Sequence, residues 1–247
     1  MKNTLFRYSS PSSKFFLNEL TKRELYFSHP SDFNDPFDCQ MEYKRALEEA
    51  LEQANLKEYF SSKELSELLE HTLNNVGVCC FSRAKKNQLM WSHYAEKHTG
   101  ICLGFNREVL RRDLSINLIK NVVYQASHPL DTMIGQFQIL AMDDVPDIKA
   151  LLNTFIYPLL ITKYSYWKYE RETRFITKNY GTQSISNKAI QSLTLGLKIS
   201  NDIKGKVFRL LQQPEWSHVK VYQAKKAQGR FALDFDRLSQ SGELICQ

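Results

Sequence analysis

The sequence predicts a single α+β domain in which short mixed strands form a cleft, with helices between and around them. The chain has 247 residues, a length that suits one large domain or two small ones. Hydrophobic residues make up 43% and charged residues 24%, so a packed core can form without disulfide support. Only 9 glycines and 7 prolines are present, which argues against disorder and against a repetitive, turn-rich β protein.

The predicted strands are short apolar or aromatic runs bounded by turn-forming residues. In chain order they cover residues 5–8, 25–28, 76–82, 100–105, 118–124, 193–199, 219–224 and 231–235. The last two could form a hairpin. A further strand is predicted at residues 166–176, where apolar flanks enclose a row of charges.

Helices are predicted where apolar residues recur every three or four positions after a capping residue. Ser12 or Ser13 caps a helix through Leu20, and residues 43–75 form a helical insert whose second helix opens with a capping box at Ser61–Glu64. Further helices are predicted at residues 87–95, 145–162 and 200–211. This irregular succession of strands and helices favours the α+β class.

Charge, hydropathy and cysteine content limit the possible partners and cellular location of the protein. A net charge of +6 and a pI near 8.9 permit contact with nucleotides or nucleic acid without demonstrating it. No run approaches the roughly 18 apolar residues of a membrane span, and no signal-peptide core follows Met1. We therefore expect a cytoplasmic protein without membrane contact. The chain has an odd number of cysteines and no CxxC pair, which indicates reduced thiols rather than disulfides or a zinc site. The cysteines are Cys39, Cys79, Cys80, Cys102 and Cys246.

The strand predicted at residues 166–176 carries the strongest candidates for chemistry. Glu170, Glu172 and Arg174 share one face of an extended strand, because successive side chains alternate. Two carboxylates and a guanidinium are poor core material unless they are paired, yet the flanks of this strand are apolar. We therefore expect an active-site strand with these three as catalytic residues. The alternative is an exposed strand with a cross-strand ladder of ion pairs.

A second group of candidates lies in and after the helix predicted at residues 87–95. Trp91 and Tyr94 are neighbours at i and i+3, with His93 on another side and His98 shortly after. Such rings can stack on a planar ligand and offer hydrogen bonds, as a nucleotide pocket requires. The alternative places the two large rings in the core and His98 at a helix C-terminus. The two histidines lack the i,i+4 spacing of metal ligands, so we expect no metal there.

Two polar groups near the N-terminus complete the candidates. Asn34, Asp35 and Asp38 could ligate a cation or orient a ribose hydroxyl, although a turn held by side-chain-to-backbone bonds is the simpler interpretation. Arg7, beside Tyr8 at the end of the first strand, offers a forked donor for a phosphate or carboxylate. A surface salt bridge is its ordinary alternative.

These residues also carry a resemblance to a known family. The blocks that carry it occur between residues 5 and 175, in this order: Leu5–Tyr8, Glu24–Ser28, Asn34–Asp38, Cys80–Ser82, Met90–Tyr94, His98–Gly100, Gly104–Phe105, and Lys163, Trp167, Glu170, Glu172 and Arg174. As a set they resemble a bacterial family designated domain of unknown function 2971. That family brings no settled activity.

A remoter similarity is to the ADP-ribosyltransferase superfamily, in which NAD lies in a cleft between two small sheets. It is carried by a first strand ending in a polar residue, a short helix, a second strand ending in Ser28, and a late strand with the pattern Glu170-x-Glu172. The similarity implies a split sheet and NAD as substrate. It implies a cleft lined by Arg7, Ser28, Trp91, His93, Tyr94, Glu170, Glu172 and Arg174.

The same similarity implies roles for these residues. Arg7 would hold the pyrophosphate or the nicotinamide-side ribose. Ser28 or Tyr26 would order the nicotinamide half, with Trp91 or Tyr94 as a stacking surface. Glu172 would bind the ribose 2′-hydroxyl and stabilise an oxocarbenium-like transition state, while Glu170 would help to activate the acceptor. Arg174 would keep Glu172 ionised by lowering its pKa.

Three functional hypotheses follow. The leading one is an NAD-using ADP-ribosyltransferase or NAD glycohydrolase, an effector or toxin that could act in anti-phage defence on nucleic acid or protein and could have an inhibitory partner protein. The second is a metal-dependent nuclease in which Asp35, Asp38, Glu170, Glu172 and His98 hold Mg²⁺ or Mn²⁺. The third is a non-catalytic module that binds a nucleotide or nucleic acid through Arg7 and Arg174.

Overall fold

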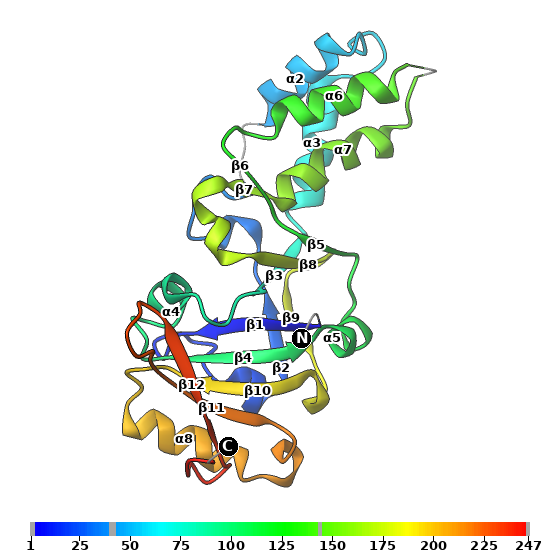
Figure 1. Ribbon diagram of the computed structural model, residues 1–247. Coiled ribbons are helices and arrows are strands. Elements are labelled where there is room, and N and C mark those ends of the chain that lie inside the picture. The colour runs from blue at the N-terminus through cyan, green and yellow to red at the C-terminus, as the bar shows by residue number, and fades with distance from the viewer. Residues whose placement is uncertain (1–2, 40–42, 143–144, 246–247) are drawn as a thin grey trace.

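The protein is described by a computed structural model that covers residues 3–39, 43–142 and 145–245 (Figure 1). It has the predicted α+β class. A large sheet has the strand order β12-β11-β10-β4-β1-β3-β8-β5, and all neighbouring strands in it are antiparallel except β10 and β11. Its strands are β1 (Thr4–Ser9), β3 (Gly77–Ser82), β4 (Ile101–Asn106), β5 (Leu118–Asn121), β8 (Glu172–Thr177), β10 (Ile190–Leu195), β11 (Lys220–Lys226) and β12 (Leu233–Leu238).

The large sheet is divided between β1 and β3. Strand β1 pairs with β4 along its whole length, from Thr4 to Ser9, but it meets β3 only at the pair Phe6–Ser82. Beyond that pair, β3 continues with β8. The two halves therefore open away from each other at one point, which creates space between them for side chains from both.

Two small strand pairs and several short helices surround the sheet. Strand β2 (Glu24–Phe27) pairs with β9 (Gly181–Ser184), and β6 (Val123–Gln125) runs parallel to β7 (Thr162–Tyr164). The helices near the sheet are α1 (Asn18–Thr21), α4 (Gln88–Tyr94), α5 (Arg107–Asp113) and α8 (Asn201–Leu211), with 3-10 turns η1 (Pro30–Asp32), η2 (Ser165–Glu170), η3 (Asn187–Ala189) and η4 (Pro214–Trp216).

A layer of longer helices gathers at one end of the molecule, beyond β5 and β8 (Figure 1). It consists of α2 (Tyr43–Gln53), α3 (Ser62–Leu73), α6 (Leu130–Leu140) and α7 (Ile148–Ile161). The insert predicted at residues 43–75 supplies α2 and α3, and Ser61 caps α3 by accepting a hydrogen bond from the Glu64 amide. These helices share a core that also includes Val78 and Ile176, so β3 and β8 connect the helical layer to the rest of the sheet.

Two predicted elements were wrong in extent. The helix predicted from Ser12 or Ser13 through Leu20 is reduced to α1, because Leu17 adopts a left-handed φ of 65° just before it. Residues 165–170 form the 3-10 turn η2 instead of a strand, and Arg171 ends that turn with a left-handed φ of 48°. Strand β8 therefore begins only at Glu172. Helices α5 and α6 and strands β7 and β9 were not predicted.

Other predictions agree with the fold to different degrees. The strand predicted at residues 118–124 is divided into β5 and β6, which belong to different sheets, and the strand predicted at residues 193–199 is β10, which ends at Leu195. The last two strands, β11 and β12, pair antiparallel as the predicted hairpin. The long apolar helix is α7, whose buried Leu151, Phe155 and Leu159 recur at helical spacing. In the part of the chain that the structure describes, no helix has the length and apolar character needed to cross a membrane.

Candidate functional site

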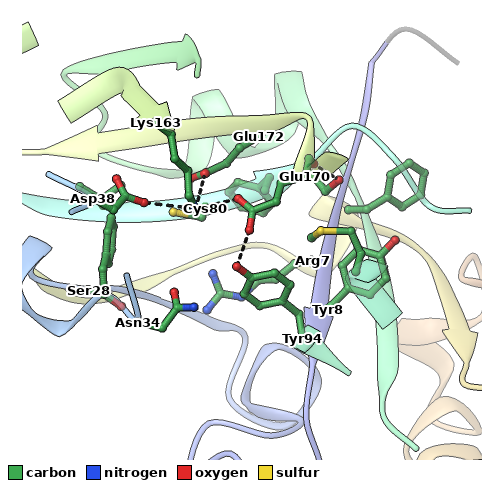
Figure 2. A pocket seen from close by; sticks show the side chains of 16 residues that line it. Arg7, Tyr8, Ser28, Asn34, Asp38, Cys80, Tyr94, Lys163, Glu170 and Glu172 are labelled. Carbon is green, nitrogen blue, oxygen red and sulfur yellow. Dashed lines mark hydrogen bonds and ion pairs between the residues drawn. The ribbon is translucent and has the colours of Figure 1, made fainter. Parts of the chain in front are cut away.

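A cavity of about 290 Å³ lies where β1 and β3 separate (Figure 2). Strand β1 contributes one wall, β3 another, and the segment around η2 and β8 closes the side next to the helical layer. The residues that line it are Phe6, Arg7, Tyr8, Ser28, Phe33, Asn34, Asp38, Val78, Cys80, Phe81, Ser82, Met90, Tyr94, Lys163, Glu170 and Glu172. Segments far apart in sequence thus bring their polar side chains to one cavity.

Arg174 lies behind the carboxylates on one side of this cavity and contacts two of them, those of Asp38 and Glu172. Its guanidinium is fully buried, and its terminal nitrogen Nη2 donates to both carboxylate oxygens of Asp38, at 2.8 and 2.7 Å. Its Nε donates to Glu172 at 2.8 Å, and one terminal nitrogen donates to the Leu160 carbonyl at 2.8 Å. Leu160 lies in the last turn of α7, where free carbonyls carry partial negative charge, so the guanidinium also satisfies that helix end.

Lys163 is the second cation of the group. It lies on β7, directly after α7, and its Nζ lies 2.7 Å from Glu170, 3.2 Å from Asp38 and 3.5 Å from Glu172. Figure 2 shows the three carboxylates converging on this ammonium. Tyr94 of α4 donates its hydroxyl proton to the other oxygen of Glu170. We call Asp38, Lys163, Glu170, Glu172 and Arg174 the buried charge cluster.

The two glutamates of the buried charge cluster have opposite pKa shifts. Burial alone would raise the pKa of Glu172, but the charges of Arg174 and Lys163 outweigh it and lower that pKa to about 2. Burial raises the pKa of Glu170, and Lys163 offsets this only in part. Burial would lower the pKa of Lys163, yet Glu172 and Glu170 raise it above its usual value. Paired carboxyl groups with separated pKa values can divide the roles of charge stabiliser and proton carrier.

The lowered pKa of Glu172 predicts a specific loss of stability in acid. Because its folded pKa of about 2 lies below the ordinary 4.5, this carboxylate stabilises the fold above pH 4.5, by about 3 kcal/mol, and that contribution disappears as pH falls from 4.5 to 2. Glu170, with its raised pKa, acts in the opposite direction, but above pH 4.5. Urea unfolding between pH 5 and pH 2 should show this loss, and Glu172→Gln should flatten it. An unchanged slope in that variant would contradict the assignment.

Arg7 reaches the same cavity but is already paired. Its Nε lies 3.2 Å from Glu19 of α1, and it donates to the Cys79 sulfur at 2.9 Å. Glu19 is buried, so the surface salt bridge considered for Arg7 is in fact an interior one. The remaining guanidinium donors are those that could meet a ligand. Arg7 and Glu172 thus line one cavity, as the cleft inferred from sequence requires.

Four predicted ligand-binding residues lie elsewhere. Trp91 is a core residue at 0% exposure, and its indole N–H donates to the Lys85 carbonyl. His93 is exposed, and its ring approaches Tyr169 at 6.2 Å. His98 stacks on Trp91, with a left-handed φ of 74°, beyond the end of α4. Tyr26 stacks on Phe15 at 4.5 Å, on the far side of Arg7. The core alternative was therefore correct for Trp91, because large rings at helical spacing mostly serve packing.

The loop at residues 34–38 divides its residues between two roles. Asp35 accepts a hydrogen bond from the Phe37 amide at 3.0 Å, which is the structural turn that the sequence suggested. Asp38 instead joins the buried charge cluster, and Asn34 lines the cavity. Ser28 also lines it, as does Tyr8, whose hydroxyl donates to the Ala84 carbonyl at 2.6 Å.

Glu170, Glu172 and Arg174 were predicted to share one face of a single strand, and this geometry is only partly correct. Glu172 and Arg174 share one face of β8, but Glu170 arrives from η2 rather than from the same strand. Every residue of β8 is buried, so the alternative of an exposed ion-pair ladder was wrong. Arg174, at 0% exposure, contacts Glu172 and Asp38 but is not among the residues that line the cavity.

Lys163 and Cys80 both belong to the blocks that carry the family resemblance, but neither was proposed from the sequence as a site residue. Their place in those blocks was the available signal. Cys80 lines the cavity, and burial raises the pKa of its thiol well above the usual value. The donors expected for a metal are not assembled as predicted, since Asp35 and His98 lie outside the cluster. Across the described ranges, no three His, Cys, Asp or Glu residues are grouped to hold a metal ion.

Comparisons with known proteins bear on the family but not on an activity. No curated protein and no solved structure matches the chain. One family model matches part of the chain. The blocks Met90–Tyr94 and Lys163–Arg174 lie inside the matched part, whereas Arg7 and the loop at residues 34–38 precede it. Over residues 90–175, the chain matches the model of the family DUF2971, described as a protein of unknown function.

Proposed function

We propose that this protein cleaves NAD in the 290 Å³ cavity, as an ADP-ribosyltransferase or NAD glycohydrolase. The observation that carries the proposal is that Arg7 from one half of the divided sheet and Glu172 from the other line one cavity, with Tyr94 and Glu170 beside them. A cavity of this volume is at the small end of ligand sites, so it suits the nicotinamide–ribose half of a dinucleotide rather than the whole molecule.

The chemistry would proceed by loss of nicotinamide. The bond between ribose C1′ and the nicotinamide nitrogen breaks, its electron pair leaves with nicotinamide, and positive charge develops on the ribose. Glu172 is ionised and fixed by Arg174 and Lys163, so its negative charge is available without reorganisation. A water or acceptor hydroxyl then forms the new bond to C1′, and Glu170, with its raised pKa, accepts the proton that this nucleophile loses.

Arg7 and Tyr94 would contribute to binding and positioning. The guanidinium donors of Arg7 that Glu19 and Cys79 leave free suit a phosphate oxygen. Tyr94 holds Glu170 through its hydroxyl and presents its ring to the cavity. The nuclease hypothesis has no comparable support, because two cations already occupy the centre of the carboxylate group.

The proposal is tested by incubating the folded protein with NAD labelled in the adenylate half and measuring free nicotinamide. Release of nicotinamide with label in ADP-ribose indicates a glycohydrolase, and label on an added nucleic acid or protein indicates a transferase. Absence of both, with NAD, DNA, RNA and cell protein all supplied, would overturn the proposal. The role of such an activity as a toxin or in anti-phage defence, and an inhibitory partner, stay predictions.

A further inference from the structure

A second cavity, of about 430 Å³, lies on the other side of two members of the buried charge cluster. Asp38 and Lys163 line both cavities, and their ion pair at 3.2 Å forms part of the wall between them. The rest of the second cavity is mainly apolar and aromatic, with Phe37, Pro129, Leu159 and Trp167 among its lining residues. An apolar cavity with a few buried polar groups on one wall is the usual form of a small-ligand site.

Phe37 at this cavity belongs to a group of exposed rings. Its side chain is 82% exposed, and Tyr164, which lines the same cavity, is 45% exposed. Several exposed apolar groups gathered at one cavity, unlike a single exposed ring elsewhere on the surface, are typical of a binding surface. Trp167 lies across the same cavity, and the Lys163 ammonium lies 5.0 Å from the centre of its ring.

Further rings continue from the cavity along η2. The Tyr164 and Tyr166 rings are 4.8 Å apart, and Tyr166 is 78% exposed. The Trp167 ring is 5.9 Å from that of Tyr169, which in turn approaches His93. Exposed cations follow in the same segment, at Lys168 and Arg171. Aromatic rings interleaved with cations, on a chain of net charge +6, are the combination that holds unpaired bases and their phosphates.

We propose that the second cavity binds a nucleobase of a single-stranded nucleic acid whose backbone runs along η2. A base inside a duplex is stacked and paired, so only an unpaired or extruded base can enter a cavity of this kind. Because the two cavities share Asp38 and Lys163, the bound strand lies next to Glu170 and Glu172. The idea that this strand is the acceptor of ADP-ribose rests on the proposed NAD cleavage. The binding of the strand does not.

The binding is tested without NAD, by fluorescence anisotropy of labelled single strands of about 12 nucleotides, as DNA and as RNA, against the matched duplex. Phe37→Ala should weaken single-strand binding about tenfold, because one stacking partner is lost. The matched control is Phe231→Ala, since Phe231 is also fully exposed, at 104%, but lies in the turn between β11 and β12. It should leave affinity unchanged.

Tryptophan fluorescence gives an independent readout. Of the three tryptophans, Trp91 and Trp216 are at 0% exposure, so quenching by a bound base should report Trp167 alone and vanish in Trp167→Phe. A preference for DNA or for RNA would identify the strand. Equal affinity for duplex and single strand, or equal affinities of the Phe37 and Phe231 variants, would overturn the proposal. Strand binding without nicotinamide release would instead count against the proposed NAD cleavage only.

Discussion

Arg174→Met is expected to lower the free energy of unfolding by about 3–5 kcal/mol, the largest effect on stability that we predict for a single substitution. Methionine keeps much of the length of the side chain but leaves Asp38 and Glu172 buried beside one cation instead of two. It also leaves the Leu160 carbonyl without its guanidinium donor. Urea denaturation at neutral pH measures the loss.

The matched control is Arg111→Met, which removes the same charge from an exposed position on α5. It should change the free energy of unfolding by less than about 0.5 kcal/mol. If the two variants were equally stable, Arg174 would not stabilise the buried charge cluster or its contact with α7.

Glu172→Gln is expected to reduce nicotinamide release at least 100-fold, of the order seen when a preorganised charge-stabilising group is lost. Glutamine preserves the shape of the side chain and removes the charge that would face the ribose. Glu67→Gln, at an exposed position of α3, removes an equal charge outside the cavity lining and should leave the rate unchanged. Rates are compared only for variants whose circular dichroism matches that of the parent protein.

Tyr94→Phe separates catalysis from folding in the same assay. It removes the hydroxyl that holds Glu170 but leaves every charge of the cluster in place. A smaller loss of rate, with a shifted pH profile, is expected because the pKa of Glu170 depends on this contact. If Glu172→Gln retained the parent rate while folded, Glu172 would have a structural role only.

The sequence was most informative where local pattern and burial agree. The periodic leucines of α3 and the apolar spacing of α7 predicted both helices, and alternation predicted that Glu172 and Arg174 share a face. It failed at η2, where aromatic residues with high strand propensity form a 3-10 turn. Their rings pack on one another there, and Arg171 takes a left-handed conformation that propensity does not reveal.

The site was predictable in part for a similar reason. Charged residues beside apolar and aromatic ones are noticeable in a sequence, so Asp38, Glu170, Glu172 and Arg174 were all identified as candidates. Lys163 was not, because its role arises from α7 ending at Ile161 and turning the next residues into the cluster. Trp91 and His93 were assigned to the cleft because a helical pattern tells which residues share a face but not whether that face meets the core, solvent or a cavity.

A crystal structure of the protein soaked with NAD is the most direct measurement of the central claim, that one cavity between the sheet halves holds the substrate. We expect the nicotinamide-side ribose beside Glu172 and a phosphate within hydrogen-bond distance of Arg7, both in the cavity lined by Tyr94. NAD bound at another surface, or no bound NAD at concentrations that saturate ordinary nucleotide sites, would contradict the claim.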